Sequence, residues 1–524
     1  MLEQLKMFAG YARGLGSFLK SPMGPSECRS LLESQLASRG ENFLAIMQKS
    51  VYENPKSPYL PLLRLAGVEH GDLSRMVSES GVEGALDRLY ESGVYITLDE
   101  FKRRVPIKRP GLEIETGPHD FDNPFLSKHY QSRTSGSRGG GTRVIMDLDL
   151  LHHDAACNRF MFEGFGLMDR PAALWREVPP VTTGVNVLLR YAKLGKRAER
   201  WFSSSKLSTA PKSLQFAVFT YYTVLASRLL GMPLPFPEHV PLEDAATVAK
   251  WLARKCAAGT PAFLDTQVSA SVRTCAAAIE SGLDISGTMF IIGGEPYTKA
   301  KADVISSAGA NAAARYSMAE LGNLGFPCAD GASFDDIHLM TDKVAVIQRE
   351  KKLGAGELSV NGFVYTTILP HCPKIMLNVE SDDYAEVEER DCGCPFGALG
   401  FRTHLTGIRS YEKLTSGGVT FLGTELLRLI EEVLPKAFGG RPTDYQLSEE
   451  EEGGLTKVSI LISPRVGEVN EGDVIRETVS FLGRFPGGDI MSDQWVQGGT
   501  LRVVRREPYT TASAKILPLH IHKG

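Results

Sequence analysis

A strand, a glycine turn, a helix and a second strand follow one another near the middle of this chain, and this order constrains the fold more than any other feature of the sequence. The apolar run Thr288–Ile292 ends in two glycines, residues 298–308 have helical spacing, and the short apolar run Ala312–Tyr316 follows. Two strands joined through a helix pair in parallel, so the sequence predicts an α/β fold with a parallel sheet. Ligands bind at the carboxyl ends of such strands, which places a candidate site at residues 293–295 and just after Tyr316.

The patterns on either side of this unit divide the chain into three parts. Residues 1–120 have helical spacing with Pro-rich breaks and are predicted to be a helical N-terminal segment of a large domain. Residues 121–407 are predicted to be the core of that domain, with parallel or mixed sheets and a β-rich subdomain from about 330 to 401. A break at 407–418 leads into residues 408–524, which are predicted to form a small α+β C-terminal domain.

Apolar periodicity also predicts individual elements. Helices are expected at 245–257, 268–279, 424–434 and 471–482, and strands at 457–463 and 500–504. The acidic run Glu449–Glu452 is interpreted as a solvated turn.

The composition excludes several classes of protein. The 524 residues include 58 basic and 62 acidic side chains, and a formal charge of −4 gives no long-range attraction to nucleic acid or to an anionic membrane. Eight cysteines in a chain of this length need not form a disulfide framework. Charged residues interrupt the first twenty positions, and the least charged stretch, 214–227, is too short to cross a bilayer. We expect a soluble cytoplasmic protein without nucleic-acid or membrane partners, and the sequence leaves its oligomeric state open.

The segment Thr134–Arg143 is rich in glycine, hydroxyl and arginine side chains. Small residues leave backbone N–H groups accessible, and hydroxyls and guanidinium groups add donors, so such a loop can wrap a polyphosphate. It is not a Walker loop, because no GKS or GKT follows. The alternative is a flexible linker.

The loop resembles the phosphate-binding loop T-S-G-T-T-G-x-P-K of adenylate-forming enzymes. It is more similar to that of phenylacetate–coenzyme A ligase-like members, where Thr often ends the loop as Thr142 does here; Arg138 and Gly141 depart from the pattern. The resemblance implies that the residues holding the ATP phosphates are Thr134, Ser135, Gly136, Ser137 and Thr142.

Two further segments resemble family motifs around the adenine and the metal. Gly293–Pro296 is similar to a G-G-E-P turn, which implies that Gly294, Glu295 and Pro296 border the adenine. Tyr316–Glu320 is similar to Y-G-x-T-E, which implies that Tyr316 packs on the adenine and that Ser317 and Ala319 lie near the nucleotide. Glu320 would hold Mg²⁺, a task suited to a hard oxygen ligand. Ala319 replaces the usual Thr and removes one hydroxyl near the α-phosphate.

Three later positions complete the resemblance, which covers roughly residues 132–515. Asp383 stands where the family Asp bonds both ribose hydroxyls, with Asp382 as the spare candidate. Arg409 stands where an Arg contacts the nucleotide, although Tyr411 replaces the usual hinge Asp. Lys515, near the end of the chain, aligns with the mobile catalytic Lys that neutralises charge between the substrate carboxylate and the α-phosphate.

Cys328, His338, Cys392 and Cys394 are a candidate Cys₃His zinc site, with Cys372 as a possible substitute ligand. Some phenylacetate–coenzyme A ligase-like proteins carry a similar C-x-C-G segment. The alternative is a set of reduced thiols beside an unrelated histidine.

The resemblance implies an ATP-dependent carboxylic acid–CoA ligase. It would use ATP, Mg²⁺ and coenzyme A, form an acyl-adenylate, and release pyrophosphate and AMP, with a small domain that moves between the two steps. The alternatives are an acyl-adenylate ligase that serves a carrier protein, a protein thiol or an amine, a catalytically silent nucleotide-binding relative, and a zinc-held scaffold. An aromatic or hydrophobic acid is suggested by the rings of Phe160, Phe162, Phe165, Trp175, Phe216 and Phe219, which are equally suited to a core.

Overall fold

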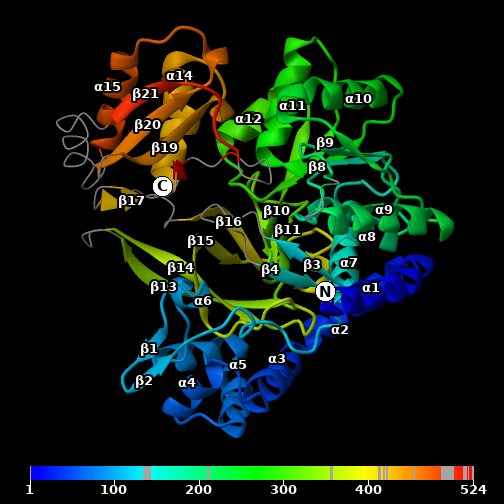
Figure 1. The fold of residues 1–524 in the computed structure, drawn as a ribbon, viewed down its shortest axis with the longest axis vertical. Coiled ribbons are helices and arrows are strands. Elements are labelled where there is room, and N and C mark those ends of the chain that lie inside the picture. The colour runs from blue at the N-terminus through cyan, green and yellow to red at the C-terminus, as the bar shows by residue number, and fades with distance from the viewer. Residues whose placement is uncertain are drawn as a thin grey trace.

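The structure is a computed structural model of the whole chain (Figure 1). It describes residues 2–133, 143–208, 210, 213–353, 358–410, 415–416, 419–420, 423–452, 455–484, 501–510, 516 and 519–521. Within this part, a twelve-stranded sheet runs in the order β13-β14-β15-β16-β12-β11-β10-β9-β8-β5-β6-β7.

One half of the large sheet is parallel and contains the predicted strand–helix–strand unit. β9 and β10 pair in parallel from Met289↔Asn311 to Gly293↔Arg315, with α12 between them in sequence, so the parallel prediction is confirmed. The strands are β5 Ala172–Trp175, β6 Arg200–Ser203, β7 Pro237–His239, β8 Phe263–Gln267, β9 Met289–Gly293 and β10 Asn311–Met318.

Helices cover both faces of this half, because its strands are apolar on both sides. α10, α11 and α12 pack on side chains such as Trp175 and Phe290, whereas α7 and α8 pack on the alternate side chains, such as Leu174 and Ile291. The helices are α7 Leu148–Gly164, α8 Thr183–Lys193, α9 Leu214–Leu229, η2 Leu242–Asp244, α10 Ala245–Ala257, α11 Val268–Glu280 and α12 Lys299–Ser307.

The other half of the sheet is antiparallel and corresponds to the predicted β-rich region. β10 belongs to both halves, since it pairs in parallel with β9 and antiparallel with β11. The strands are β11 Gly322–Pro327, β12 Ile337–Leu339, β13 Val344–Leu353, β14 Leu358–Thr367, β15 Val379–Glu389 and β16 Thr403–Ser410, with a short helix η3 Gly397–Leu399. The break was predicted to begin at residue 407, and this start is wrong because β16 continues through Gly407. Gly407 has a left-handed backbone conformation with φ 64°, which glycine adopts without strain.

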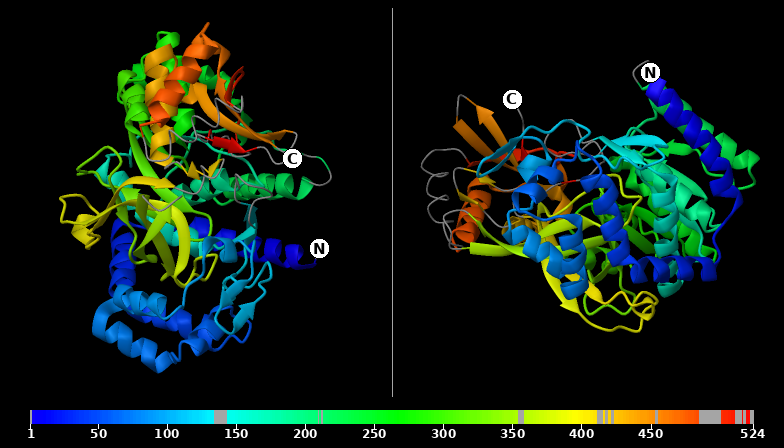
Figure 2. Two further views of the ribbon diagram at one scale, coloured as in Figure 1. Left: turned by 90° about the vertical axis from the view of Figure 1, so that its left-hand side faces the viewer. Right: turned by 90° about the horizontal axis from the view of Figure 1, so that it is seen from below.

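The N-terminal segment is helical, as its spacing predicted; α5 and α6 pack on strands of the antiparallel half, whereas α1 and α2 pack on α7 and α8 of the parallel half. Figure 2 shows these helices, in blue, on the side of the molecule away from the C-terminal unit, in orange. Asn378 fixes them to the sheet, because its buried amide donates to Leu86 O and Val94 O. The elements are α1 Leu2–Lys20, α2 Pro25–Ala37, α3 Arg39–Met47, η1 Gln48–Tyr52, α4 Tyr59–Leu65, α5 His70–Glu91, α6 Leu98–Phe101, β1 Ile107–Arg109 and β2 Leu112–Ile114. The antiparallel pair β3 Tyr130–Arg133 and β4 Arg143–Met146 follows, within the predicted core of the large domain.

The C-terminal residues build a separate four-stranded sheet, ordered β21-β20-β19-β22, with its own apolar core. The helix predicted at 424–434 is split, because Leu429–Val433 has π-helical bonding. The turn predicted at Glu449–Glu452 is wrong: β19 pairs with β20 as far as Glu452↔Leu455, since a backbone ladder started by buried residues does not depend on side-chain polarity. The elements are β17 Thr415–Ser416, β18 Val419–Thr420, α13 Gly423–Arg428, η4 Leu429–Val433, α14 Leu434–Phe438, η5 Pro442–Asp444, β19 Tyr445–Glu452, β20 Leu455–Ile462, η6 Pro464–Val466, α15 Glu471–Leu482, β21 Leu501–Arg505 and β22 Leu519–Ile521.

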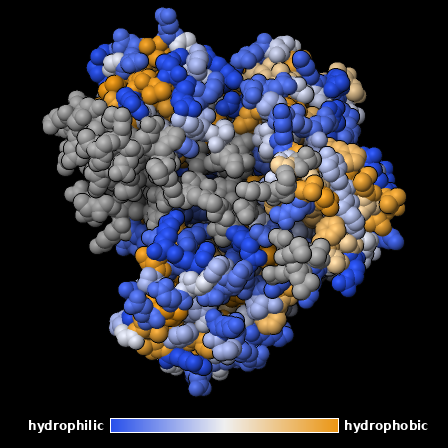
Figure 3. Space-filling model, in the orientation of Figure 1, coloured by the Kyte–Doolittle hydropathy of each residue, from blue (hydrophilic) through white to orange (hydrophobic). Residues whose placement is uncertain are grey.

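α9 contains the weakly charged stretch noted in the sequence. Its outer face exposes large apolar side chains, and Figure 3 shows orange residues gathered over this part of the surface. Among the described residues, none of the helices combines the length and apolarity needed to cross a bilayer. The exposed apolar residues of α9 are Leu214, Val218, Tyr221, Leu225 and Leu229.

Candidate functional site

The end of β9 meets β10 where the first predicted nucleotide segment begins. A Cβ on Gly293 would lie 2.8 Å from Arg315 O, so glycine is required for this close strand contact. Glu295 turns toward the start of α11, where its carboxylate accepts from the N–H and the hydroxyl of Ser269, each at 2.8 Å. Gly294 and Pro296 flank Glu295 in the same turn, directly at the carboxyl end of the parallel half.

Tyr316 and Asp383 meet although they lie on different strands. The Tyr316 hydroxyl donates to Asp383 Oδ2 at 2.5 Å and is also hydrogen-bonded to the Tyr365 hydroxyl. Burial, followed by the Asp383 charge, raises the pKa of Tyr316 well above its usual value, so this hydroxyl stays protonated and can donate. Arg409 lies on the neighbouring strand, where it pairs with Tyr384 while Asp383 pairs with Ser410, so the side chains of Arg409 and Asp383 leave opposite faces of the sheet. The fold therefore brings Tyr316 and Asp383 into contact and places Arg409 one strand away.

Glu320 follows β10 and is 5% exposed. Its carboxylate pairs with Lys102 Nζ at 2.7 Å, and its carbonyl accepts from Lys374 N at 3.1 Å. The N-terminal segment thus supplies the counter-charge of the predicted metal ligand. Ser317 and Ala319 lie between Tyr316 and Glu320, and Ser317 faces Asn323 across a bulge in the β10–β11 ladder.

A basic cavity of about 300 Å³ lies beside Glu320. Asp122 links two residues of its lining, because its carboxylate forms ion pairs with Arg143 Nη2 at 2.7 Å and with Lys374 Nζ at 2.5 Å. Sequence patterns gave no sign of Lys102 or Lys374, because each comes to the site from a distant segment. The cavity is lined by Phe101, Lys102, Arg103, Pro118, His119, Phe121, Arg143 and Lys374.

Several predicted residues lie outside the described part of the chain. They are Thr134, Ser135, Gly136, Ser137, Thr142 and Lys515. The described residues that border them are paired: Arg133 lies opposite Arg143 at the end of β3 and β4, and Thr510 bridges Ile516.

A second cavity, of about 550 Å³, opens beside Arg409 between the large sheet and the C-terminal unit. Close to it, Lys301 Nζ and Glu431 Oε1 form a buried ion pair of 2.6 Å across the two units, and Thr298 also donates to Glu431. Lys301 further donates to Pro296 O at 3.0 Å, so this contact borders the predicted adenine turn.

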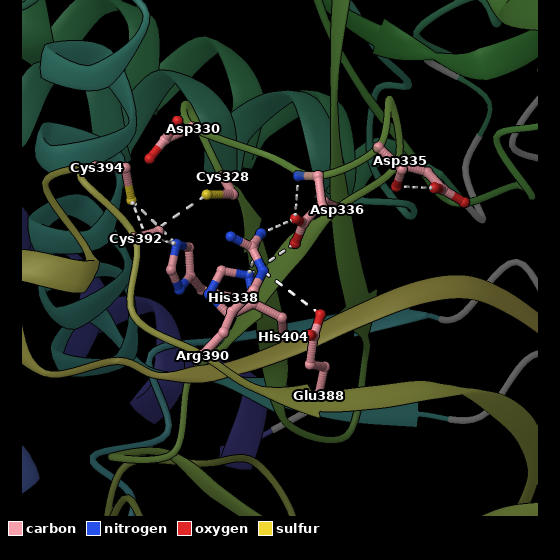
Figure 4. Close-up of polar contacts among 12 residues, drawn as sticks. Cys328, Asp330, Asp335, Asp336, His338, Glu388, Arg390, Cys392, Cys394 and His404 are labelled. Atoms are coloured by element: carbon pink, nitrogen blue, oxygen red, sulfur yellow. Dashed lines mark hydrogen bonds and ion pairs between the residues drawn. The ribbon is translucent and has the colours of Figure 1, made fainter.

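The candidate zinc ligands come together, as Figure 4 shows. The Sγ atoms of Cys328 and Cys392 are 3.8 Å apart, those of Cys392 and Cys394 are 3.4 Å apart, and His338 Nε2 lies 3.5 Å and 3.0 Å from Cys392 and Cys394. Tetrahedral zinc, with Zn–S of about 2.3 Å and Zn–N of about 2.0 Å, requires about 3.8 Å between sulfurs and about 3.5 Å between sulfur and nitrogen. Two of the four distances match these values and the other two are shorter by about 0.4–0.5 Å, so the four side chains are gathered at nearly the spacing of a zinc site.

Two further features suit these residues to a metal. His338 Nδ1 bonds to Phe401 O at 2.9 Å, which leaves Nε2 facing the thiols. Hydrogen bonds from Cys328 and from His338 lower the pKa of the Cys394 thiol, which favours the thiolate form that binds metals. Cys372 lies elsewhere, since its Sγ contacts Leu321 O.

The aromatic residues considered as a lining of the acid pocket are mostly core. Phe162 packs against Tyr191 and Phe263, and Phe219 packs against Tyr11. Phe160, Phe162, Trp175 and Phe219 are buried among other apolar side chains, so they give no information about the acid. The two cavities described above are not lined by these rings.

Comparisons with known proteins bear on the fold. No family model matches the chain, and no curated protein matches it by sequence. Among solved structures, 2-hydroxyisobutyryl-CoA ligase in its postadenylation state with R3-HIB-AMP superposes with a TM-score of 0.54 at 14% identity, over 96% of this chain and 91% of that one. The chain has the fold of this CoA ligase. The same ligase with 2-HIB-AMP gives 0.52 at 14% identity over the same shares.

O-succinylbenzoate coenzyme A synthetase from Bacillus subtilis, in complex with ATP and magnesium ion, gives a TM-score of 0.43 at 11% identity, over 75% of this chain and 69% of that one. At that score it adds nothing to the fold assignment. The predicted α/β fold is confirmed by the sheet of this structure and by its superposition on 2-hydroxyisobutyryl-CoA ligase. The closer resemblance to phenylacetate–coenzyme A ligase-like proteins stays a prediction.

Proposed function

We propose that this protein is an ATP-dependent carboxylic acid–CoA ligase that works through an acyl-adenylate. The observation that supports this most directly is the contact in which the Tyr316 hydroxyl donates to Asp383, at the carboxyl end of the parallel strands. These two groups suit an adenosine: the ring can stack on the base, and the carboxylate can accept from ribose hydroxyls. Arg409, on the neighbouring strand, is the candidate partner of a phosphate. The shared ligase fold adds independent support.

Glu320 and the basic cavity suit the triphosphate. Glu320 would hold Mg²⁺, which neutralises phosphate charge when bound. Its carboxylate already pairs with the Lys102 ammonium, so this buried position accepts a positive charge. The cavity lined by Lys102, Arg143 and Lys374 would accommodate the phosphates that leave.

The proposed chemistry has two displacements. A carboxylate oxygen of the acid attacks the α-phosphorus of ATP, the bond from that phosphorus to the bridging oxygen breaks, and pyrophosphate leaves. The thiolate of coenzyme A then attacks the acyl carbon, and AMP departs with the electron pair of the carbon–oxygen bond. On the sequence evidence, residues 134–142 are assigned to the phosphates and Lys515 to the charge that develops in the first step.

The decisive experiment measures pyrophosphate release from MgATP across a panel of aromatic, aliphatic and hydroxy acids, with and without coenzyme A. A ligase releases pyrophosphate with at least one acid and consumes coenzyme A. Release without consumption would move the acceptor to a carrier protein, a protein thiol or an amine. ATP binding without release for any acid would leave a silent nucleotide-binding protein and overturn the proposal.

An Asp383→Ala variant tests whether the activity comes from this site. Loss of the ribose-binding carboxylate should raise the KM for ATP about tenfold or more, because a charged hydrogen-bonding group is removed. Asp391→Ala is a matched control, since Asp391 is 77% exposed and pairs outward with Arg402.

A further inference from the structure

A bulge near the end of β16 sets the position of Arg409. Glu386 pairs with Thr406 and Tyr384 pairs with Arg409, so two residues of β16 face a single residue of β15. Gly407 is the first of those two and has φ 64°, the arrangement of a glycine bulge. Such bulges re-aim the side chains that follow them, and here the residue re-aimed is Arg409.

The bulge is held from outside its own ladder. Asp335 Oδ2 accepts the N–H of Gly407 at 3.1 Å, and Asp335 belongs to the loop 328–336 between β11 and β12. Because a left-handed glycine turns its N–H away from the neighbouring strand, this carboxylate replaces the missing ladder partner. The position of loop 328–336 therefore determines the geometry of the bulge.

The loop is fixed at its far end by Asp336, which is 3% exposed. Its carboxylate accepts from Ala332 N at 2.8 Å, lies 2.8 Å from His404 Nδ1, and pairs with Arg390. Cys328 N donates to Asp336 O at 3.0 Å, which closes the loop at its base. Figure 4 shows this group beside the three thiols.

The candidate zinc ligands surround the same loop. Cys328 begins the loop, His338 follows it on β12, and Cys392 and Cys394 come from the segment between β15 and β16. Without a metal, three thiols and one imidazole make only weak mutual contacts, whereas a zinc ion would join both ends of the loop to that segment.

We propose that a zinc ion bound by Cys328, His338, Cys392 and Cys394 clamps loop 328–336, and that the loop, through Asp335, holds the Gly407 bulge that aims Arg409. Asp335 is a positioning residue in this scheme. The clamp itself stands on the contacts above, whereas its consequence for nucleotide affinity rests on the proposed function.

The test follows zinc content, hydrogen exchange of the backbone amides of residues 403–410, and affinity for α,β-methylene-ATP with Mg²⁺. The wild-type protein should contain about one zinc per chain. Zinc removal by a chelator should speed exchange at Gly407 about tenfold or more, while β8 exchanges as before. Asp335→Ala should keep its zinc, show the same faster exchange and bind the analogue more weakly.

The proposal also predicts that the effects of zinc removal and of Asp335→Ala on exchange at Gly407 are not additive. Zinc removal from Asp335→Ala should produce no further acceleration at Gly407, because both changes release one contact. Asp391→Ala, which substitutes an exposed Asp next to a ligand cysteine, should match the wild type in zinc content and exchange.

Three results would overturn the proposal: protein purified without chelators that holds no zinc, unchanged exchange at Gly407 after zinc is removed, or additive effects of zinc removal and Asp335→Ala. If zinc removal unfolds the chain, the zinc content of the purified protein decides whether the metal is bound, and the exchange of Gly407 in Asp335→Ala decides whether the loop holds the bulge. If the wild-type protein, the zinc-free protein and Asp335→Ala all fail to bind the analogue, the proposed function is refuted. The exchange data would still show whether zinc holds the loop and the bulge.

Discussion

The buried pair between Lys301 and Glu431 should make a large contribution to docking of the C-terminal unit. The two side chains are 5% and 4% exposed, and Nζ lies 2.6 Å from Oε1. Removing one member of the pair leaves the other charge buried without a partner, which lowers the stability of the contact by about 3–5 kcal/mol. Lys301→Met and Glu431→Gln should each lower the free energy of opening this contact strongly. The loss in the double variant should be about 2–4 kcal/mol smaller than the sum of the two single losses.

Native-state hydrogen exchange provides the assay. Amides of α12 and of η4–α14 report opening of this contact, and the four proteins of the cycle give the coupling energy. The pair Arg441–Glu280 is the control, because its side chains are 22% and 63% exposed and its coupling should stay below about 1 kcal/mol. A coupling near zero at Lys301–Glu431 would refute the reasoning that burial strengthens this contact.

The remaining predictions concern chemistry and stability. Lys515→Ala should slow pyrophosphate release about 100-fold or more while the melting temperature stays unchanged, and near-normal release would remove the role proposed for this lysine. Glu320→Gln should raise the Mg²⁺ concentration needed for half-maximal activity about tenfold or more, measured by magnesium titration at fixed ATP. Burial alone would raise the pKa of Asp154, but the Lys343 ammonium and further contacts outweigh it and hold that pKa well below its usual range. Its stabilising contribution is therefore present above the unfolded pKa of about 3.9 and is lost as pH falls below it, so Asp154→Asn should flatten the acid side of a melting-temperature profile; an unchanged acid limb would contradict this.

Local patterns were enough to predict the elements that depend on nearby residues. The helix at 245–257 and the parallel pairing on either side of α12 follow from apolar spacing that is complete within each segment. Glu449–Glu452 was misjudged because its strand conformation comes from pairing with β20, which side-chain polarity does not reveal. Gly407 was taken for the start of a break, although a glycine can equally sit inside a bulged strand.

The sequence predicted which residues would form the candidate site, but not the residues from distant segments that hold them in place. The resemblance pointed to Tyr316, Asp383 and Arg409; the fold brings Tyr316 and Asp383 into contact and places Arg409 on the neighbouring strand. Lys102 meets Glu320 across 218 positions of sequence, and no spacing rule links residues so far apart. The four candidate zinc ligands could be predicted because they are three cysteines and a histidine, whereas the contact of Asp335 with Gly407 could not be predicted because it depends on the geometry of loop 328–336.

Among the described strands, β10 joins the parallel half of the large sheet to the antiparallel half. A nucleotide seated at its end would touch residues from both halves, so its binding energy would be shared by two parts of the protein that differ in topology. Ligand should then merge their melting into a single, more cooperative transition, and a fragment containing only one half should have no measurable ATP affinity.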